Sequence, residues 1–139
     1  MPAALPTILL VDDDDPTRRI LRRWLTHLGV QGQVLEAEDG QQALDLVEAY
    51  YQVEVPSPLL IILDLSMPVM DGLEFLERHA QLPPVSRQNT VVVVLSGGVP
   101  SASQQAQIHF LAADIKLKPL DIVGLASLVQ QHLPAALPS

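Results

Sequence analysis

The chain has 139 residues, of which 48% are hydrophobic and 17% charged, and its formal net charge is −8. This length and composition indicate one globular domain with a sizeable core and exclude a disordered or fibrous chain. The acidic balance argues against direct nucleic-acid binding, which needs a basic face. The chain has no cysteine, which excludes disulfides. It also lacks an apolar run long enough for a membrane span and a signal pattern, so we expect a cytoplasmic protein without membrane contact.

The first predicted strand covers residues 7–11, and four aspartates, residues 12–15, follow it. Pro16 suits the first position of a helix and an aspartate before it suits the N-cap, which predicts a helix over residues 16–28. One face of this helix is apolar and should cover the core, while the other carries arginines that we expect in solvent. The apolar face consists of Ile20, Leu21, Trp24, Leu25 and Leu28, and the charged face of Arg18, Arg19, Arg22 and Arg23.

Four more strand–helix pairs follow along the chain. The strands are expected at residues 33–38, 59–64, 90–95 and 113–117, and the helices at residues 40–51, 72–81, 101–111 and 121–132. Strands 59–64 and 90–95 are almost wholly aliphatic, which is typical of strands buried on both faces in the middle of a parallel sheet. The alternation predicts an α/β fold with a five-stranded parallel sheet and helices on both faces. We expect a single domain over residues 1–139, with its core at about 7–132 and a disordered tail at 133–139.

Polar side chains follow four of the predicted strands. They are Asp12 and Asp13, Asp64, Ser96, and Lys118. Because parallel strands place their carboxyl ends at the same edge of a sheet, these side chains are expected to share one site. Asp64 could instead cap the next helix, but Asp71 with Glu74 three residues later fills that role better.

Three carboxylates close together need help to stay ionised. A like-charge pair about 4 Å apart costs roughly 4 kcal/mol at an effective dielectric constant of 20. Either one carboxyl keeps its proton or a divalent cation lies among them, and carboxylate ligands with retained waters are typical of Mg²⁺. Lys118 and the Ser96 hydroxyl could hold the oxygens of an incoming phosphoryl group. The pattern therefore predicts an aspartate that forms an acyl phosphate.

These motifs resemble the receiver domain of two-component response regulators over residues 7–132. The resemblance is carried by Leu9-Leu10-Val11-Asp12-Asp13, Asp64, Met67-Pro68, Asp71-Gly72, Ser96-Gly97 and Lys118-Pro119. It implies a flavodoxin-like (βα)5 three-layer fold with strand order 2-1-3-4-5. It also implies a protein that catalyses only its own phosphorylation and dephosphorylation.

The resemblance further implies a role for each site residue. Asp64 corresponds to the phosphoacceptor, while Ser96 and Lys118 correspond to the hydroxyl and the lysine that contact the phosphoryl group. The magnesium ligands would be Asp12, Asp13, Asp64 and the backbone carbonyl of Ser66. The phosphoryl donor would be a histidine on a sensor kinase or a histidine phosphotransfer protein, and the signal would pass on by protein contact. Met1 directly before the domain favours a free-standing regulator over a piece of a hybrid kinase.

The sequence departs from the family pattern at two places. Ile115 occupies the position, three residues before the lysine, where the family usually has Tyr or Phe. Without a ring that can turn inward, we expect phosphorylation to persist and its conformational signal to be weaker or differently carried. Leu111-Ala112 replaces a frequent Gly-Ala, for which we expect only local repacking.

Two other functions remain open. Asp12-Asp13-Asp14 satisfies the Asp-x-Asp pattern of haloacid-dehalogenase-like phosphatases, which would make Asp12 the nucleophile but leaves Asp64 unexplained. A pseudo-receiver, a binding module that is never phosphorylated, is the other. We expect Asp14 and Asp15 to be solvated or to cap the helix. The four histidines are expected at the surface or its boundary: His27, His79, His109 and His132.

Overall fold

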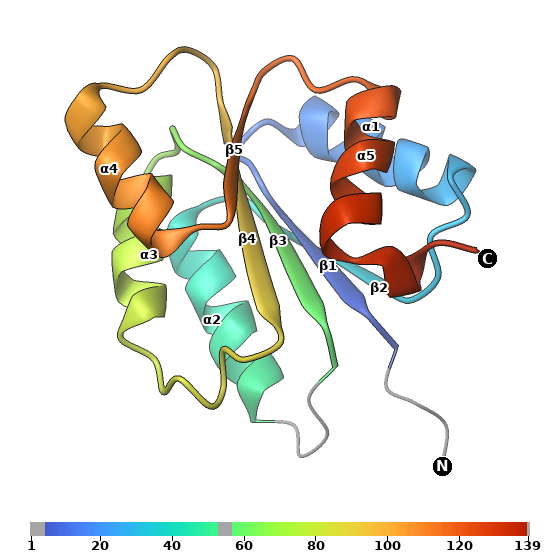
Figure 1. The fold of residues 1–139 in the computed structure, drawn as a ribbon, viewed down its shortest axis with the longest axis horizontal. Helices are drawn as coiled ribbons and strands as arrows, with labels where there is room; N and C mark the ends of the chain where they lie inside the picture. Colours follow the sequence, from blue (N-terminus) through green and yellow to red (C-terminus); the bar gives the residue numbers. More distant parts are fainter. Residues whose placement is uncertain (1–4, 53–56, 139) are drawn as a thin grey trace.

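The computed structural model describes residues 5–52 and 57–138, in which five parallel strands alternate with five α-helices (Figure 1). The sheet order is β2-β1-β3-β4-β5. The strands are β1 (Thr7–Val11), β2 (Gln33–Ala37), β3 (Leu59–Asp64), β4 (Thr90–Ser96) and β5 (Asp114–Leu117). The helices are α1 (Asp15–His27), α2 (Gly40–Tyr51), α3 (Gly72–Ala80), α4 (Ala102–Leu111) and α5 (Ile122–His132). The predicted flavodoxin-like α/β fold is confirmed.

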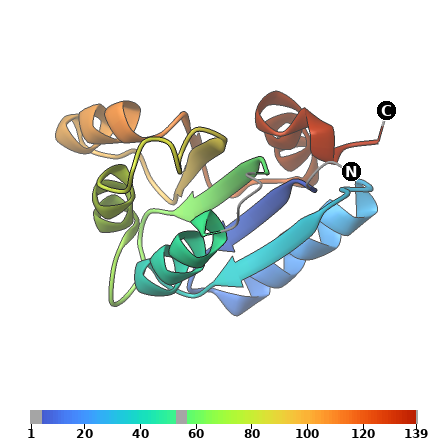
Figure 2. The ribbon, with the colours of Figure 1, turned by 90° about the horizontal axis from the view of Figure 1, so that it is seen from below.

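The helices cover the two faces of the sheet unequally. Helices α1 and α5 lie on one face and α2, α3 and α4 on the other (Figure 1 and Figure 2). Successive residues of the central strands alternate between the two cores, since Ile61 packs with the α2–α4 side while Leu60 and Ile62 pack with α1 and α5. All six residues of β3 are buried, as expected for a strand covered on both faces.

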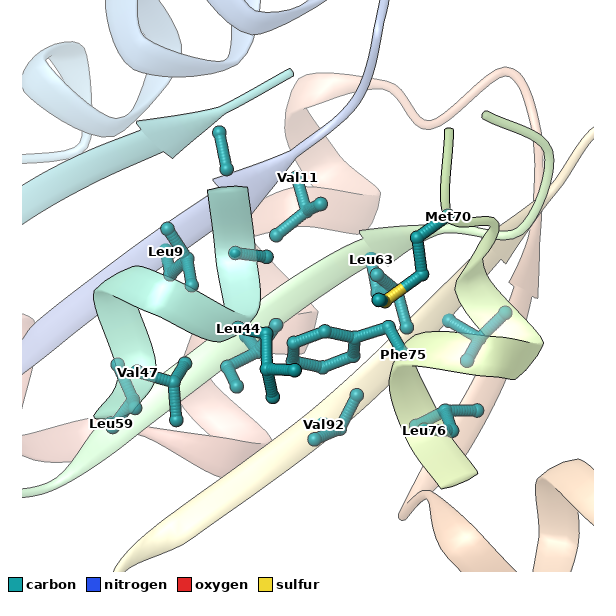
Figure 3. Packing of buried hydrophobic residues seen from close by; sticks show 14 of the residues in the cluster. Leu9, Val11, Leu44, Val47, Leu59, Leu63, Met70, Phe75, Leu76 and Val92 are labelled. Atoms are coloured by element: carbon teal, nitrogen blue, oxygen red, sulfur yellow. The ribbon is translucent and has the colours of Figure 1, made fainter. Parts of the chain in front are cut away.

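Phe75 anchors the core on the α2–α4 side. Its ring is fully buried and lies beside Leu44 of α2 (Figure 3). Helix α3 can bring this ring close to the sheet because Gly72, at its first position, has no side chain. A Cβ at Gly72 would lie 2.6 Å from the backbone oxygen of Asp64, too close for any other residue. Asp71 caps α3 by accepting a hydrogen bond from the Glu74 backbone N–H at 2.9 Å, as predicted.

The carboxyl-terminal segment differs from the prediction. A disordered tail at residues 133–139 is wrong for residues 133–138, while Ser139 lies outside the described residues. A 3₁₀ helix covers Pro134–Ala136, and Ala136 is 1% exposed. The Ala136 backbone oxygen accepts a hydrogen bond from the Gln31 N–H at 2.7 Å. The segment is ordered because Leu133 and Ala136 add apolar surface to the core between α1 and α5.

Smaller differences concern individual residues. Asp14, rather than the residue directly before Pro16, is the N-cap of α1, and Asp15 is the first residue of the helix. His79 is buried within α3 instead of at the surface. Leu111, at the position of the frequent glycine, is the last residue of α4 and does not have a positive φ, so nothing in the backbone requires glycine there. In the described part of the chain, no helix is long and apolar enough to cross a membrane.

Candidate functional site

The ends of β1 and β3 bring three aspartates together. Val11 pairs with Leu63 in the parallel register, so the next residue of each strand, Asp12 and Asp64, reaches the same edge of the sheet. One carboxylate oxygen from each of Asp12, Asp13 and Asp64 lies within 4.8 Å of the others. Asp12 and Asp64 are buried, whereas Asp13 is exposed and leaves one side of the cluster open to water.

Lys118 reaches this cluster from the end of β5. Its Nζ atom lies 3.1 Å from Oδ2 of Asp12 and 3.2 Å from Oδ1 of Asp64. Its backbone N–H donates to the Ser96 carbonyl oxygen at 2.7 Å, which ties the lysine to the end of β4. We call Asp12, Asp13, Asp64 and Lys118 the acidic pocket. The carboxyl ends of the strands, where these residues stand in the sequence, are the upper ends in Figure 1.

The charges in the acidic pocket do not balance, because three carboxylates face one ammonium. Burial raises the pKa of the Asp64 carboxyl, and the neighbouring Asp12 carboxylate raises it further against the opposing effect of Lys118. Burial alone would lower the pKa of Lys118, but its hydrogen bonds and ion pairs with Asp12 and Asp64 outweigh this and raise it. A divalent cation would remove this excess of negative charge. Clustered carboxylates beside an open, solvated side could hold Mg²⁺, which prefers oxygen ligands and keeps several waters.

Ser96 and Ser66 stand at the ends of strands that neighbour the acidic pocket: Ser96 is the last residue of β4, and Ser66 follows β3 by two residues. Ser96 is buried at the end of β4, and its hydroxyl donates a short hydrogen bond to the Gly98 carbonyl oxygen. The hydroxyl is therefore held by its own loop in this state. Ser66 is exposed, and its backbone N–H contacts Oδ1 of Asp64 at 3.4 Å. The roles predicted for the Ser96 hydroxyl and the Ser66 carbonyl stay predictions.

Sequence reasoning missed Arg18. This arginine was placed on the solvated face of α1, but its side chain is 5% exposed and contacts the backbone oxygen of Asp12. Conversely, Ile20 was placed on the core face and is 47% exposed. The helical spacing contained the signal, because Arg18 lies three and seven residues before the buried Leu21 and Leu25 and so shares their face.

Asp14 and Asp15 stabilise the start of α1, and the predicted capping role is confirmed for Asp14. Asp14 accepts a hydrogen bond from the Thr17 backbone N–H at 3.1 Å, and its bond with the Thr17 hydroxyl is the main cause of its lowered pKa. Asp15 pairs with Arg19 at 2.7 Å. The acidic stretch therefore divides into two residues of the pocket and two residues of the helix.

A groove of about 540 Å³ adjoins the acidic pocket along α1. We call it the α1 groove; it is lined by Asp14, Pro16, Thr17, Ile20, Leu21, Trp24, Leu95, Lys118, Pro119 and Leu120. Its lining is mostly apolar, with Ile20 from α1 and Leu120 from the loop before α5 among its residues. Lys118 lines the groove and also belongs to the pocket, so the two adjoin directly.

Comparisons with known proteins agree with this geometry. The sequence pattern of the family "Response regulator receiver domain" matches residues 8–130. The chain is 34% identical over 125 residues to "Uncharacterized 14.6 kDa protein in sodA1 3'region" of Leptolyngbya boryana, covering 90% of this chain and 88% of that protein. It is 36% identical over 92 residues to "Autoinducer 1 sensor kinase/phosphatase LuxN" of Vibrio campbellii, covering 66% of this chain but only 9% of that protein. The solved structure of Vibrio cholerae chemotaxis protein CheY4 at low pH has 25% identity and a TM-score of 0.75, covering 94% of this chain and 100% of that one.

Proposed function

The chain belongs to the family of response regulator receiver domains, and from this membership we propose that it is a phosphorylation switch in two-component signalling. The observation that carries the proposal is the acidic pocket, in which a buried aspartate with a raised pKa lies beside two more carboxylates and an ammonium. A purely structural ion-pair cluster would balance its charges. This pocket has an excess of negative charge at an open edge, which suits a site for a cation and a phosphoryl group.

In the proposed reaction, a carboxylate oxygen of Asp64 attacks the phosphorus of a phosphohistidine on the donor. The new O–P bond forms as the N–P bond breaks, and the imidazole leaves with the electron pair of that bond. Lys118 already contacts Asp64 and would hold one phosphoryl oxygen. The Ser96 hydroxyl would turn from Gly98 to hold another. Water later attacks the phosphorus, which releases inorganic phosphate and restores the carboxylate.

Mg²⁺ would be held by Asp12, Asp13 and Asp64, with the Ser66 carbonyl as a further proposed ligand. When bound, it would neutralise charge on the phosphoryl group in the transition state. The protein itself contributes the buried walls of the pocket and the ammonium of Lys118. These hold the acceptor oxygen in a fixed place before the donor arrives.

The proposed donor is a sensor histidine kinase or a histidine phosphotransfer protein. Its docking on α1 is supported by the α1 groove and by the exposed arginines beside it, of which Arg19 has a 75% exposed side chain. An acidic donor surface would be attracted to these arginines, and its apolar residues could enter the groove. We further propose a cytoplasmic location, which the acidic, cysteine-free composition favours.

Incubation with acetyl phosphate and Mg²⁺, followed by intact-protein mass spectrometry, tests this function. We expect one phosphoryl group on the wild-type protein and none on Asp64→Asn, with labelling of Asp12→Asn retained at high Mg²⁺. Labelling lost in Asp12→Asn but kept in Asp64→Asn would instead identify a phosphatase-like nucleophile. A lack of labelling in the wild type, and of beryllofluoride binding, would identify a binding module that is never phosphorylated.

A further inference from the structure

Arg18 is the buried arginine of α1, and nothing in the proposed reaction uses it. Its guanidinium contacts four acceptors in the described structure. Nη1 donates to the backbone oxygen of Asp12, and Nη2 lies 2.7 Å from Oδ1 of Asp15. Nε donates to Oε1 of Glu36 at 3.2 Å, while Nη2 is 3.8 Å from Oε1 of Glu38. A side chain with 5% exposure and this many partners is held in one orientation.

The contact with Asp12 is the one that concerns the acidic pocket. Asp12 directly follows β1, and its N–H donates to the oxygen of Ala37, the last residue of β2, at 3.1 Å. The Asp12 carbonyl belongs to the peptide that leads into Asp13. Holding that oxygen sets the plane of this peptide, and with it the directions in which the Asp12 and Asp13 carboxylates point.

We infer that Arg18 is a positioning residue for the cation site, fixing the Asp12–Asp13 peptide to β2 so that both carboxylates are set before the metal arrives. This inference rests on the proposed function only for the identity of the cation. Residues that orient metal ligands from outside the coordination shell typically contribute about 10–100-fold to metal affinity. Arg18 acts through the backbone of a ligand residue, since its contacts are with the Asp12 carbonyl and with carboxylates outside the pocket.

Simple electrostatics predicts the opposite sign. Arg18 is a cation close to a site that would bind a cation, so its removal should raise Mg²⁺ affinity if only its charge mattered. Positioning predicts that its removal lowers the affinity. Arg18→Lys separates the two further, because lysine keeps the charge but has no planar fork that can hold a carbonyl and two carboxylates together.

The chain offers matched controls on the same helix. Arg22 pairs with the same glutamate, its Nε lying 3.0 Å from Oε2 of Glu36, but its side chain is 47% exposed and bonds Val34 instead of Asp12. Arg19 shares Asp15 with Arg18 and is 75% exposed. Arg22→Met or Arg19→Met therefore removes the same charge as Arg18→Met and one contact with a carboxylate that Arg18 also contacts. The bond between Arg18 and the Asp12 carbonyl stays in place.

The experiment is Mg²⁺ titration by calorimetry of the full chain and of Arg18→Lys, Arg18→Met, Arg22→Lys, Arg22→Met and Arg19→Met. We expect about a tenfold rise in the Mg²⁺ dissociation constant for both Arg18 variants and less than about twofold for the others. In the Arg18 variants, the rate of labelling by acetyl phosphate should be lower than in the wild type at low Mg²⁺ and should equal the wild-type rate at saturating Mg²⁺. A loss of fold stability alone would lower the urea midpoint without changing the dissociation constant of the folded protein.

An unchanged dissociation constant in Arg18→Lys, or a tighter one in Arg18→Met, overturns the inference. If both Arg18 variants fail to fold, Glu36→Gln is compared with Glu38→Gln, which removes the same charge but only a 3.8 Å contact with Arg18. We expect the Mg²⁺ dissociation constant to be about threefold higher in Glu36→Gln than in Glu38→Gln, and equal constants overturn the inference. Failure of the proposed function would look different. Mg²⁺ would still bind with these affinities, but Asp64 would not be labelled.

Discussion

Two polar clusters lie at opposite ends of the sheet, and they are built in opposite ways. The acidic pocket lies at the carboxyl ends of the strands and keeps a surplus of negative charge. At the other end, the Tyr51 hydroxyl lies 2.7 Å from the hydroxyl of Thr90, the first residue of β4, and 2.8 Å from Nε2 of His79. We call these three residues the tyrosine network. The His79 ring also stacks on Phe75, with ring centroids 5.6 Å apart.

The tyrosine network and the acidic pocket differ in charge, which separates a structural cluster from a reactive one. In the tyrosine network burial lowers the pKa of His79 to about 4, so the ring is neutral near pH 7 and its partners are neutral hydrogen-bonding groups. Such a network joins α2, α3 and β4 without any buried charge. In the acidic pocket burial raises the pKa of Asp64, yet the group is kept beside another carboxylate. An arrangement that lowers stability in this way is typical of a functional site.

The largest expected effect comes from removing the cation of the acidic pocket. Lys118→Met takes away the ammonium that contacts Asp12 and Asp64, so we expect labelling of Asp64 by acetyl phosphate to slow by about 10²–10³-fold. Lys116→Met is the matched control because Lys116 pairs at 3.3 Å with Asp114, away from the pocket, and should change the rate less than about twofold. Rates from mass spectrometry check this. Equal rates for the two variants would contradict the role of Lys118.

The tyrosine network should respond to pH rather than to phosphate donors. The pKa of His79 is about 4 in the folded protein and 6.5 in the unfolded chain, so the unfolded chain binds more protons between these values. Stability from His79 is complete above pH 6.5 and is lost as the pH falls toward 4. Between pH 7 and 4.5 we expect the wild type to lose about 2–3 kcal/mol more than His79→Gln.

Urea unfolding at the two pH values measures the His79 effect. His27→Gln is the control, because it replaces an exposed histidine of α1, outside the tyrosine network. If His79→Gln and the wild type lost the same free energy of unfolding, the buried imidazole would not be the acid-sensitive group.

A smaller effect with the opposite sign is expected at the acidic pocket. Because the pKa of Asp64 is raised in the folded protein, its ionisation costs stability as the pH rises through that pKa. Asp64→Asn should therefore stabilise the metal-free protein at pH 7, by the roughly 0.5–2 kcal/mol typical of relieved functional sites. Lowering the pH or adding Mg²⁺ should reduce the difference in stability between Asp64→Asn and the wild type. Urea midpoints with and without Mg²⁺ test this, and a less stable Asp64→Asn would contradict it.

The smallest effect is expected at Ile115. This residue is half-buried and packs against the core on the α2–α4 side, and its branched side chain has no ring to turn inward. We expect amide hydrogen exchange in α4 and β5 to change by less than about twofold on beryllofluoride binding, and more in Ile115→Tyr. A large change in the wild type would show that the signal does not need an aromatic residue at this position.

Much of the fold and the pocket could be predicted from the sequence because both depend on local patterns. The aliphatic run before Asp64 predicts a buried strand, and a parallel sheet then carries Asp12 and Asp64 to one edge. Arg18 was one exception, because the rule that arginines face solvent gave the wrong side of the helix. Its spacing from Leu21 pointed to the core. Burial of the charge is stable only because the Asp12 carbonyl and nearby glutamates offset the cost of removing it from water.

The sequence alone determined the order of strands and helices, the edge at which polar residues gather, and the kinds of side chain available there. These follow from periodicity and from residue types, which act over short stretches of chain. The tertiary structure decided which charges meet and which are neutralised. It placed Lys118 between two carboxylates, buried His79 against Tyr51, and packed Ala136 beneath α1 and α5. Contacts between residues so far apart in the chain depend on how elements pack, and no local pattern specifies them.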